Sequence, residues 1–192
     1  ALKGLEVGSI AVGTTPIARS VLLPQAIGRL LKVSPALQIT VLEGTSNGLM
    51  TQLHIGDLEF MVGPMVDDAA EHGLVQEKMM EDQLSVVARR NHPLSDHQTI
   101  NFRDLAKAEW ILPLRDSPQR RQFEASFEAH GLQMRQNVIA TNALSTIREI
   151  LLETDRLAIL SPYRVHHDIT SKLLEILPID LPETRRPIGV TM

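Results

Sequence analysis

The sequence predicts an α/β protein with two lobes, each built on a mixed sheet. Short apolar runs with the period of a strand alternate with longer runs of helical period along the whole chain. The opening order of strand, helix, strand, helix and strand is typical of a parallel sheet with right-handed crossovers. The middle of the chain repeats this alternation, which fits a second lobe better than one continuous sheet.

The first lobe is expected to begin with three strands joined by two helices. The strands are Ser9 to Thr14, Leu37 to Leu42 and Leu58 to Val62. An apolar stripe from Leu22 to Leu31 predicts the first helix, which ends before Ser34-Pro35 because a residue ahead of proline disfavours helical backbone. Gly44-Thr45-Ser46 is a helix-start signal, and the helix that it opens ends at Gly56.

The second lobe is expected to span residues 76–177, with lobe I comprising residues 1–75 and 178–192. The strands predicted after the first lobe's opening are Leu74 to Met79, Leu84 to Ala88, Trp110 to Leu112, Val138 to Ala140, Leu157 to Leu160, and Leu173 to Leu177. The helices predicted here, each opened by a cap or a proline, are Asn101 to Lys107, Pro118 to Ala129, Ser145 to Glu153, and Pro162 to Asp168. The last strand, Pro187 to Val190, can return to the first sheet.

Composition excludes several classes of function. A chain of 192 residues that is 43% hydrophobic can bury a core. Its net charge of -4 argues against binding nucleic acid through phosphates, which needs a basic surface. The absence of cysteine removes disulfides and thiolate catalysis. The sequence shows no export leader and no apolar run near the length of a membrane helix, so we expect a soluble domain.

Several local runs occur in an order and spacing that resemble one protein family. They include Gly8-Ser9-Ile10-Ala11-Val12-Gly13, Leu22-Leu23-Pro24, Ser34-Pro35, Glu43-Gly44-Thr45-Ser46, Asn91-His92-Pro93-Leu94 and Phe102-Arg103-Asp104-Leu105. The run from Leu53 to Phe60 resembles a Leu-x-x-Gly-x-Leu-Asp segment, with Glu59 in place of Asp. Together these runs resemble the effector-binding, or substrate-binding, domain of LysR-type transcription regulators.

The resemblance implies two Rossmann-like lobes of the type-2 periplasmic-binding-protein fold, with a ligand cleft between them. It implies a cytoplasmic regulator that senses a small-molecule effector and needs no cofactor. Operator DNA would be bound only by a winged helix-turn-helix missing from this chain, with residues 1–7 as the end of the linker. This domain would form a homodimer and the full-length protein a homotetramer. The run from Thr154 to Pro162 replaces the family's usual Gly-Leu-Gly-Ile, and resembles a branch of regulators of sugar-binding-protein genes and aromatic catabolism.

Effector contacts are expected at strand ends and helix starts, where the positive end of a helix favours an anion. In lobe I the candidates are Thr14, Thr15, Thr45 and Ser46; in lobe II the resemblance adds Leu112, Pro113, Asn142, Ala143 and Pro162. Each polar candidate has a structural alternative. Thr14 and Thr15 can simply end a strand, whereas Thr45, Ser46 and Asn142 can cap helices. Ile17 and Ala18 stand where some family members have polar contacts.

Other functions fit the residues less well. A solute-binding protein of a transporter would share the fold, and an enzyme would need a catalytic cluster that the spacing does not provide. The adjacent His166 and His167 point apart on a helix, so no metal site is expected. Arg115 and Arg120 can meet an acidic effector or remain solvated. Outward-facing Leu23 and Leu30 would favour dimerisation through the first helix; core packing is the alternative. A sugar, a carboxylate and an aromatic acid fit equally well as effector.

Overall fold

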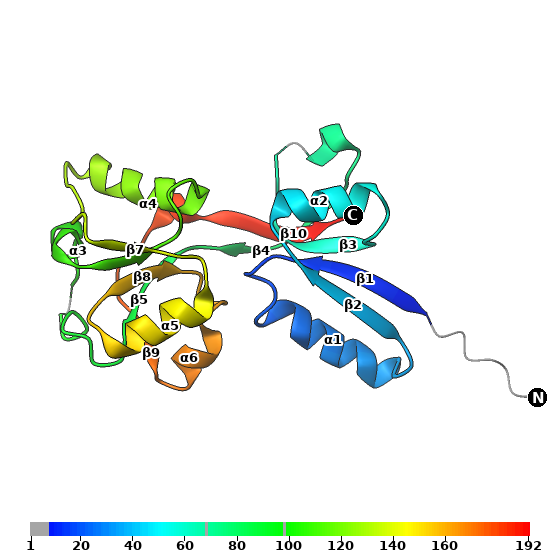
Figure 1. Ribbon diagram of the computed structural model, residues 1–192, viewed down its shortest axis with the longest axis horizontal. Coiled ribbons are helices and arrows are strands. Elements are labelled where there is room, and N and C mark those ends of the chain that lie inside the picture. The colour runs from blue at the N-terminus through cyan, green and yellow to red at the C-terminus, as the bar shows by residue number, and fades with distance from the viewer. Residues whose placement is uncertain (1–7, 68, 98) are drawn as a thin grey trace, which may run out of the picture. The chain divides into compact units, whose positions relative to one another are not determined.

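The chain folds into two compact units in a computed structural model (Figure 1), which describes residues 8–67, 69–97 and 99–192. Unit 1 contains the described residues up to Asp82 together with Arg186–Met192, and unit 2 contains Gln83–Arg185. Each unit has one five-stranded sheet. The expected linker end at residues 1–7 lies outside the described residues.

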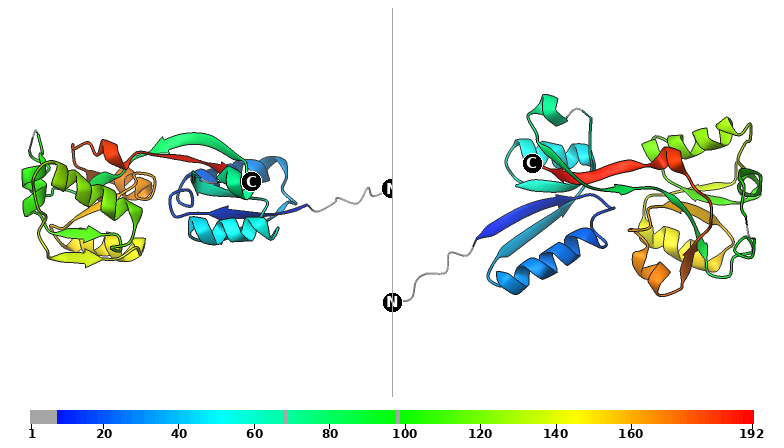
Figure 2. Two further views of the ribbon diagram at one scale, coloured as in Figure 1. Left: turned by 90° about the horizontal axis from the view of Figure 1, so that it is seen from above. Right: turned by 180° about the vertical axis from the view of Figure 1, so that it is seen from behind.

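Unit 1 has the strand order β2-β1-β3-β10-β4. The strands are β1 (Ser9–Thr14), β2 (Gln38–Glu43), β3 (Phe60–Pro64), β4 (Gln76–Asp82) and β10 (Arg186–Thr191). The helices are α1 (Leu22–Val33), α2 (Ser46–His54) and the short 3₁₀ helix η1 (Ala69–His72). The first three strands are parallel, and β10 runs antiparallel to both neighbours. Since the two crossovers run in opposite directions, α1 and α2 cover opposite faces of the sheet (Figures 1 and 2).

Unit 2 repeats this topology with the order β7-β6-β8-β5-β9. Its strands are β5 (Ser85–Arg89), β6 (Trp110–Leu112), β7 (Val138–Ala140), β8 (Leu157–Leu160) and β9 (Leu174–Ile176). Its helices are α3 (Phe102–Lys107), α4 (Pro118–Ala129), α5 (Leu144–Glu153), α6 (His166–Thr170) and the 3₁₀ helix η2 (Pro182–Thr184). The parallel β6, β7 and β8 occupy the places that β1, β2 and β3 hold in unit 1, and the antiparallel β5 takes the place of β10.

The unit boundaries differ from the expected ones. The sequence placed them after residues 75 and 177, whereas the structure divides the chain after Asp82 and Arg185. β4 belongs to the first sheet because it pairs with β10 along its length. Where these strands leave unit 1, the buried Asp82 carboxylate accepts hydrogen bonds from Nε and Nη2 of Arg186, at 3.1 and 3.0 Å. The segment before β10 stays with unit 2 because the Thr184 hydroxyl accepts from the backbone N–H of Leu84.

The sheet of unit 2 is buried on both faces, so alternate strand residues enter two different cores. Trp110 and Leu112 of β6 pack with Phe123 and Phe127 of α4. Ile111 packs on the other face, in a cluster that includes two residues of α5. The Trp110 ring is fully buried, and its Nε1 donates to the carbonyl of Leu105 at 3.1 Å. This alternation fixes which helix each strand residue meets.

Helix boundaries agree with the expected ones where a capping residue is present. Asn101 caps α3 in a capping box with Asp104. α6 begins at His166 and not at Pro162, because the intervening residues form turns in which the backbone N–H of Arg164 donates to the carbonyl of Ser161. The Asn-His-Pro-Leu run is a structural loop: the Nδ1 atom of buried His92 accepts from the N–H of Leu94, and its Nε2 lies 3.0 Å from the carbonyl oxygen of Asp155.

Two glycine-to-alanine substitutions test the packing of unit 1. A Cβ atom at Gly189 would lie 2.3 Å from the carbonyl oxygen of Glu77, whereas one at Gly28 in α1 meets nothing within 4 Å. We expect Gly189→Ala to lower the free energy of unfolding by about 1–3 kcal/mol, and Gly28→Ala to raise it by about 0.5–1 kcal/mol through helix propensity. Urea unfolding measures both, and equal stability of the two variants contradicts the close approach of β4 and β10.

Candidate binding site

The carboxyl ends of the three parallel strands of unit 1 meet at one edge of its sheet. Thr14 ends β1, and its register partners are Glu43 at the end of β2 and Val62 in β3. The carbonyl of Thr14 accepts from the N–H of Gly44 at 3.1 Å, which joins the two loops. The four residues predicted in this lobe therefore lie on loops that leave one sheet edge, where ligands bind in open α/β sheets.

Thr14 and Thr15 are held by the protein itself. Their exposed fractions are 1% and 4%. The hydroxyl of Thr14 donates to the carbonyl of Thr15, and that of Thr15 donates to the carbonyl of Val62 at 3.4 Å. Thr15 also lies directly against Gly63, where a Cβ would be 2.7 Å from its Cγ2 and Oγ1 atoms. Both hydroxyl protons are engaged, so these residues shape the edge more than they offer donors to a ligand.

Thr45 and Ser46 are more accessible. Thr45 is exposed and is the N-cap of α2, with its hydroxyl oxygen accepting from the N–H of Gly48 at 3.2 Å. Its hydroxyl proton has no acceptor among the residues that the structure describes. Ser46 is half-buried at the first helical position. The predicted capping role of Thr45 is confirmed. Its hydroxyl group can still donate a hydrogen bond to a ligand.

Unit 2 brings its predicted residues together at the matching edge. Leu112 ends β6 opposite Ala140 of β7, and its carbonyl accepts from the N–H of Thr141 at 3.0 Å. Leu112 itself is buried at 1% exposure, while Pro113 is half-buried. Pro162 follows β8, the next strand of the same sheet. The edge is thus formed by the ends of three parallel strands, as in unit 1.

Asn142 has a different role from the predicted one. The N-cap of α5 is Ala143, with no side-chain hydrogen bond to the helix. The Oδ1 atom of Asn142 accepts instead from the backbone N–H of Leu114, at 3.4 Å. The structural alternative, in which Asn142 caps the helix, is not realised, because its side chain ties the loop after β7 to the loop after β6. The first turn of α5 consequently begins without a side-chain acceptor for its N–H groups. The expected effector contact of Asn142 stays a prediction.

Two arginines at these edges were not singled out from the sequence. Arg19, on the segment after β1, forms an ion pair with Glu43 at the end of β2. Arg164, on the turn after β8, donates from Nη2 to the carbonyl of Asn142 at 3.4 Å. The sequence could have indicated them, because each follows the end of a predicted strand by four or five residues. Arg120 of α4, considered from the sequence, also reaches the edge of unit 2, where its Nη1 donates to the carbonyl of Pro113 at 3.2 Å. Guanidinium groups therefore lie at the strand edge of each unit.

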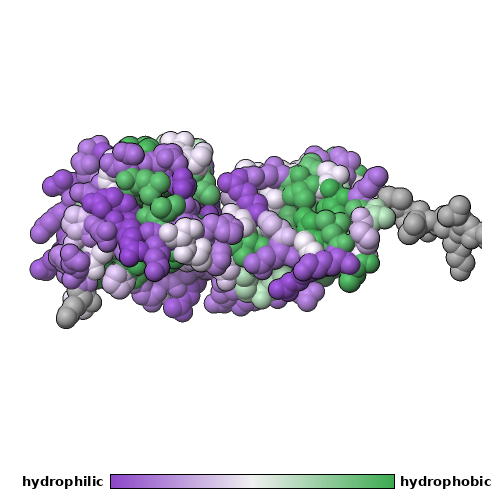
Figure 3. All heavy atoms as spheres, turned by 90° about the horizontal axis from the view of Figure 1, so that it is seen from below, coloured by the Kyte–Doolittle hydropathy of each residue, from purple (hydrophilic) through white to green (hydrophobic). Residues whose placement is uncertain are grey.

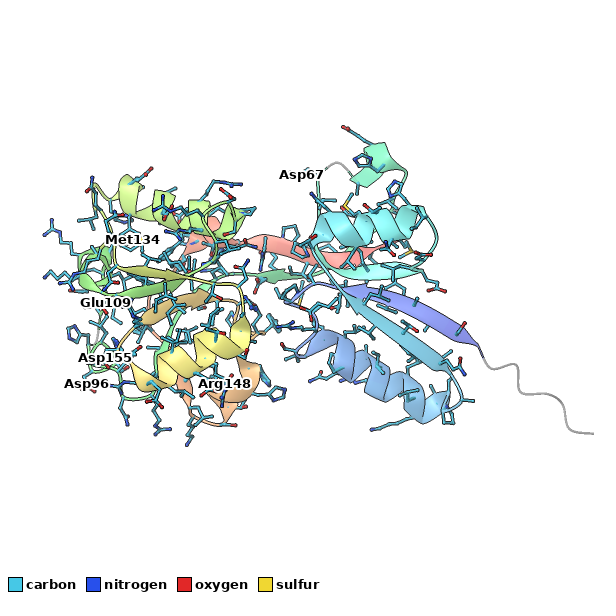
Figure 4. All side chains as sticks on the ribbon, in the orientation of Figure 1. Asp67, Asp96, Glu109, Met134, Arg148 and Asp155 are labelled. Carbon is cyan, nitrogen blue, oxygen red and sulfur yellow. The ribbon has the colours of Figure 1, made fainter. Side chains whose placement is uncertain are left out.

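The remaining charged and metal-binding candidates lie away from these edges or do not cluster. No three histidine, aspartate or glutamate residues in the described ranges are grouped so that they could hold a metal ion. Arg148 of α5, labelled in Figure 4, donates to Asp168 of α6 at 2.6 Å, and this hydrogen bond raises the pKa of the guanidinium. The pair joins two helices. Within the described residues, no helix is both long and apolar enough to span a membrane.

Comparison with known proteins identifies the family. The family model of the LysR substrate binding domain matches residues 3–192, so the chain belongs to this family. The HTH-type transcriptional regulator GalR of Pseudomonas putida is 34% identical over 190 residues, covering 99% of this chain and 48% of that protein. PcaQ of Agrobacterium fabrum, also an HTH-type transcriptional regulator, is 26% identical over 95% of the chain and 59% of its own length. The chain thus spans about half of the curated relatives it matches.

Solved structures confirm the fold. The CcmR regulatory domain of Synechocystis PCC6803 in complex with 2-PG superposes with a TM-score of 0.79 at 18% identity, covering 96% of this chain and 87% of that one. The effector binding domain of QuiR in complex with shikimate has a TM-score of 0.73 at 16% identity, covering 96% and 86%. The predicted two-lobed, periplasmic-binding-protein-like α/β fold and the family resemblance are therefore both confirmed.

The cap of α2 can be tested apart from any ligand. Thr45→Ala removes the acceptor for the N–H of Gly48, so we expect the free energy of unfolding to fall by about 0.5–2 kcal/mol. Thr45→Ser keeps the oxygen and should match the parent chain. Chemical unfolding followed by circular dichroism measures the difference. If alanine and serine give the same stability, the hydroxyl does not cap the helix.

Proposed function

We propose that this domain binds a small organic anion at the strand edge of unit 2 and transmits binding to a DNA-binding domain of the full-length regulator. The observation that carries the proposal is the edge of unit 2, where α5 starts without a side-chain cap beside Asn142 and Arg164. Backbone N–H groups at a helix start and a guanidinium together favour a carboxylate or a phosphate. Leu112, Pro113, Ala143 and Pro162 would supply backbone and apolar contacts around it.

Unit 1 offers further candidate contacts at its own strand edge. Its accessible groups are the hydroxyls of Thr45 and Ser46, with Arg19 paired to Glu43 nearby. Thr14 and Thr15 would contribute apolar packing and backbone carbonyl groups, since their hydroxyls already donate to carbonyls of the protein. The ligands in complex with two structural neighbours, 2-PG and shikimate, support a site for small polar molecules in this fold. Switching requires that the effector binds one state of the regulator more tightly than another.

The names of the relatives support the regulatory role. They are HTH-type transcriptional regulators and not enzymes. Operator DNA would be bound in the cytoplasm by an N-terminal domain, since this chain has a net charge of -4 and binding to phosphates favours a basic surface. A solute-binding protein is the weaker candidate, because the family model and the curated relatives point to regulators.

A thermal-shift screen of organic anions tests the effector site. The panel contains sugar acids, aromatic acids, short carboxylates and phosphorylated acids, with neutral sugars for comparison. A ligand at a hundred times its dissociation constant adds about 2.7 kcal/mol of stability. We expect Arg164→Gln to weaken binding of a hit by about tenfold, because it removes a charge-assisted contact to the anion. Asn142→Ala should weaken binding too, because it removes the hydrogen bond that holds the loops after β6 and β7 together. Arg103→Gln, an exposed arginine on α3, is the control. A hit with unchanged affinity in both variants places the site elsewhere.

We also propose that a second copy of this chain covers the outer face of α1. This apolar face contains Leu30 and Val33, which lie three residues apart on α1 and are exposed at 39% and 78%. Leu31 of α1 and Val41 of the edge strand β2 are also exposed, at 37% and 45%. Figure 3 shows apolar side chains gathered on the side of unit 1 where Figure 1 places α1. Leu30 thus faces outward, as dimerisation through the first helix would require. Leu23 is only 7% exposed and belongs to the core. Contiguous exposed apolar residues mark interfaces between proteins.

Charge placed on this face should separate the copies. We expect Val33→Glu to raise the dissociation constant of a homodimer at least about tenfold, since a carboxylate would lose water on association. Val75→Glu is the matched control, because Val75 is also exposed, at 65%, but lies outside α1 and β2. Sedimentation velocity over a range of concentrations measures the equilibrium. A parent chain that stays monomeric throughout contradicts the proposed dimer.

A further inference from the structure

Unit 2 contains a pocket of about 400 Å³ beside α4. One wall is a face of α4, and the other is the segment of residues 132–136 that leads toward β7; Figure 4 labels Met134 on this segment. None of the effector residues expected at the strand ends and helix starts lines this pocket, but Arg115 and Arg120, which can meet an acidic effector, do. Its volume is in the range of small-molecule sites.

The lining combines an apolar surface with four charged side chains. Phe127 is 1% exposed, and Leu132 and Met134 are half-buried, so they offer an apolar wall. The charged side chains are those of Arg115, Arg120, Glu124 and Glu128. The last three are spaced by four residues and therefore share one face of α4. Two positive and two negative charges sum to zero, so the pocket is dipolar and does not select a simple anion or a simple cation.

The ion pair in this pocket joins a buried arginine to a partly exposed glutamate, whose side chains are 7% and 43% exposed. The Arg120 side chain is 7% exposed; its Nε donates to Oε1 of Glu124 at 2.8 Å, and its Nη1 donates to the carbonyl of Pro113 at 3.2 Å. Among the described residues, no acceptor lies within hydrogen-bond range of Nη2, and no donor lies within range of Oε2 of Glu124. The pair therefore holds one donor and one acceptor for a ligand that carries both opposite groups.

We propose that this pocket binds an α-amino acid with an apolar side chain. The carboxylate accepts from Nη2 of Arg120 and from Arg115, and the ammonium group donates to Oε2 of Glu124, with Glu128 one turn further along the helix. The apolar side chain packs on Phe127, Leu132 and Met134. A carboxylic acid without the amine would leave the glutamates unmatched and repelled, and an amine without the carboxylate would leave the arginines unmatched.

Isothermal titration with L-leucine and L-methionine tests the ligand class. The comparison ligands are 4-methylpentanoate, which lacks the ammonium group of leucine, and 3-methylbutylamine, which lacks its carboxylate. We expect each to bind at least about tenfold more weakly than L-leucine, because each loses one charge-assisted set of hydrogen bonds. Binding of 4-methylpentanoate as tight as that of L-leucine overturns the proposal, as does the absence of binding by both amino acids.

Variants of exposed residues then locate the binding. Arg115→Gln and Glu128→Gln should each weaken L-leucine binding about fivefold, while Arg121→Gln, an exposed arginine of α4 outside the pocket, should not. Arg164→Gln separates this site from the effector site: L-leucine binding that persists in it supports the pocket. Loss of L-leucine binding in Arg164→Gln, with retention in Arg115→Gln and Glu128→Gln, overturns the proposal and leaves the effector site intact.

Discussion

The handedness of the β-α-β crossover is the constraint on which this structure depends. A parallel strand that follows a helix can be reached only by a right-handed connection, so two successive connections in opposite directions place their helices on opposite faces. Both units obey this rule with the same strand order. The rule also directs every loop after a parallel strand to one edge, which is why each unit presents loop residues and a helix start there. The fourth strand of each sheet runs antiparallel to both of its neighbours, and the fifth strand forms the edge of the sheet.

The two edges have the same topology but differ in how the first turn of the helix is capped. In unit 1 the helix start after β2 is satisfied by the Thr45 hydroxyl. In unit 2 the equivalent helix, α5, has no side-chain cap, and the nearby Asn142 is committed to another loop. A helix start without a cap costs stability unless water or a ligand accepts its N–H groups. The first turn of α5 lacks a side-chain acceptor for its N–H groups. In the proposed site, a bound anion would accept from these groups.

Much of the fold could be predicted because its signals are local. Strand and helix periods placed most elements, and the prolines and caps at Ser34-Pro35, Asn101 and Pro118 placed their ends. The sheet to which β4 belongs could not be predicted, since its partner β10 is more than a hundred residues away. The loops after β6, β7 and β8 were identified as site segments, but the side-chain roles within them were not. The bond from Leu114 to Asn142, and the approach of Arg164, arise only when three strand ends come together.

The distribution of aromatic residues has a consequence for optical measurements. The only tryptophan and the only tyrosine of the chain, Trp110 and Tyr163, both belong to unit 2, and Trp110 is fully buried in its core. Intrinsic fluorescence therefore reports on the packing of one unit and is silent about the other. Because the chain contains no cysteine, a single thiol introduced on unit 1 would be the sole attachment point for a dye. Trp110 and such a dye would form a donor–acceptor pair, in which energy transfer follows the separation of the two units in solution.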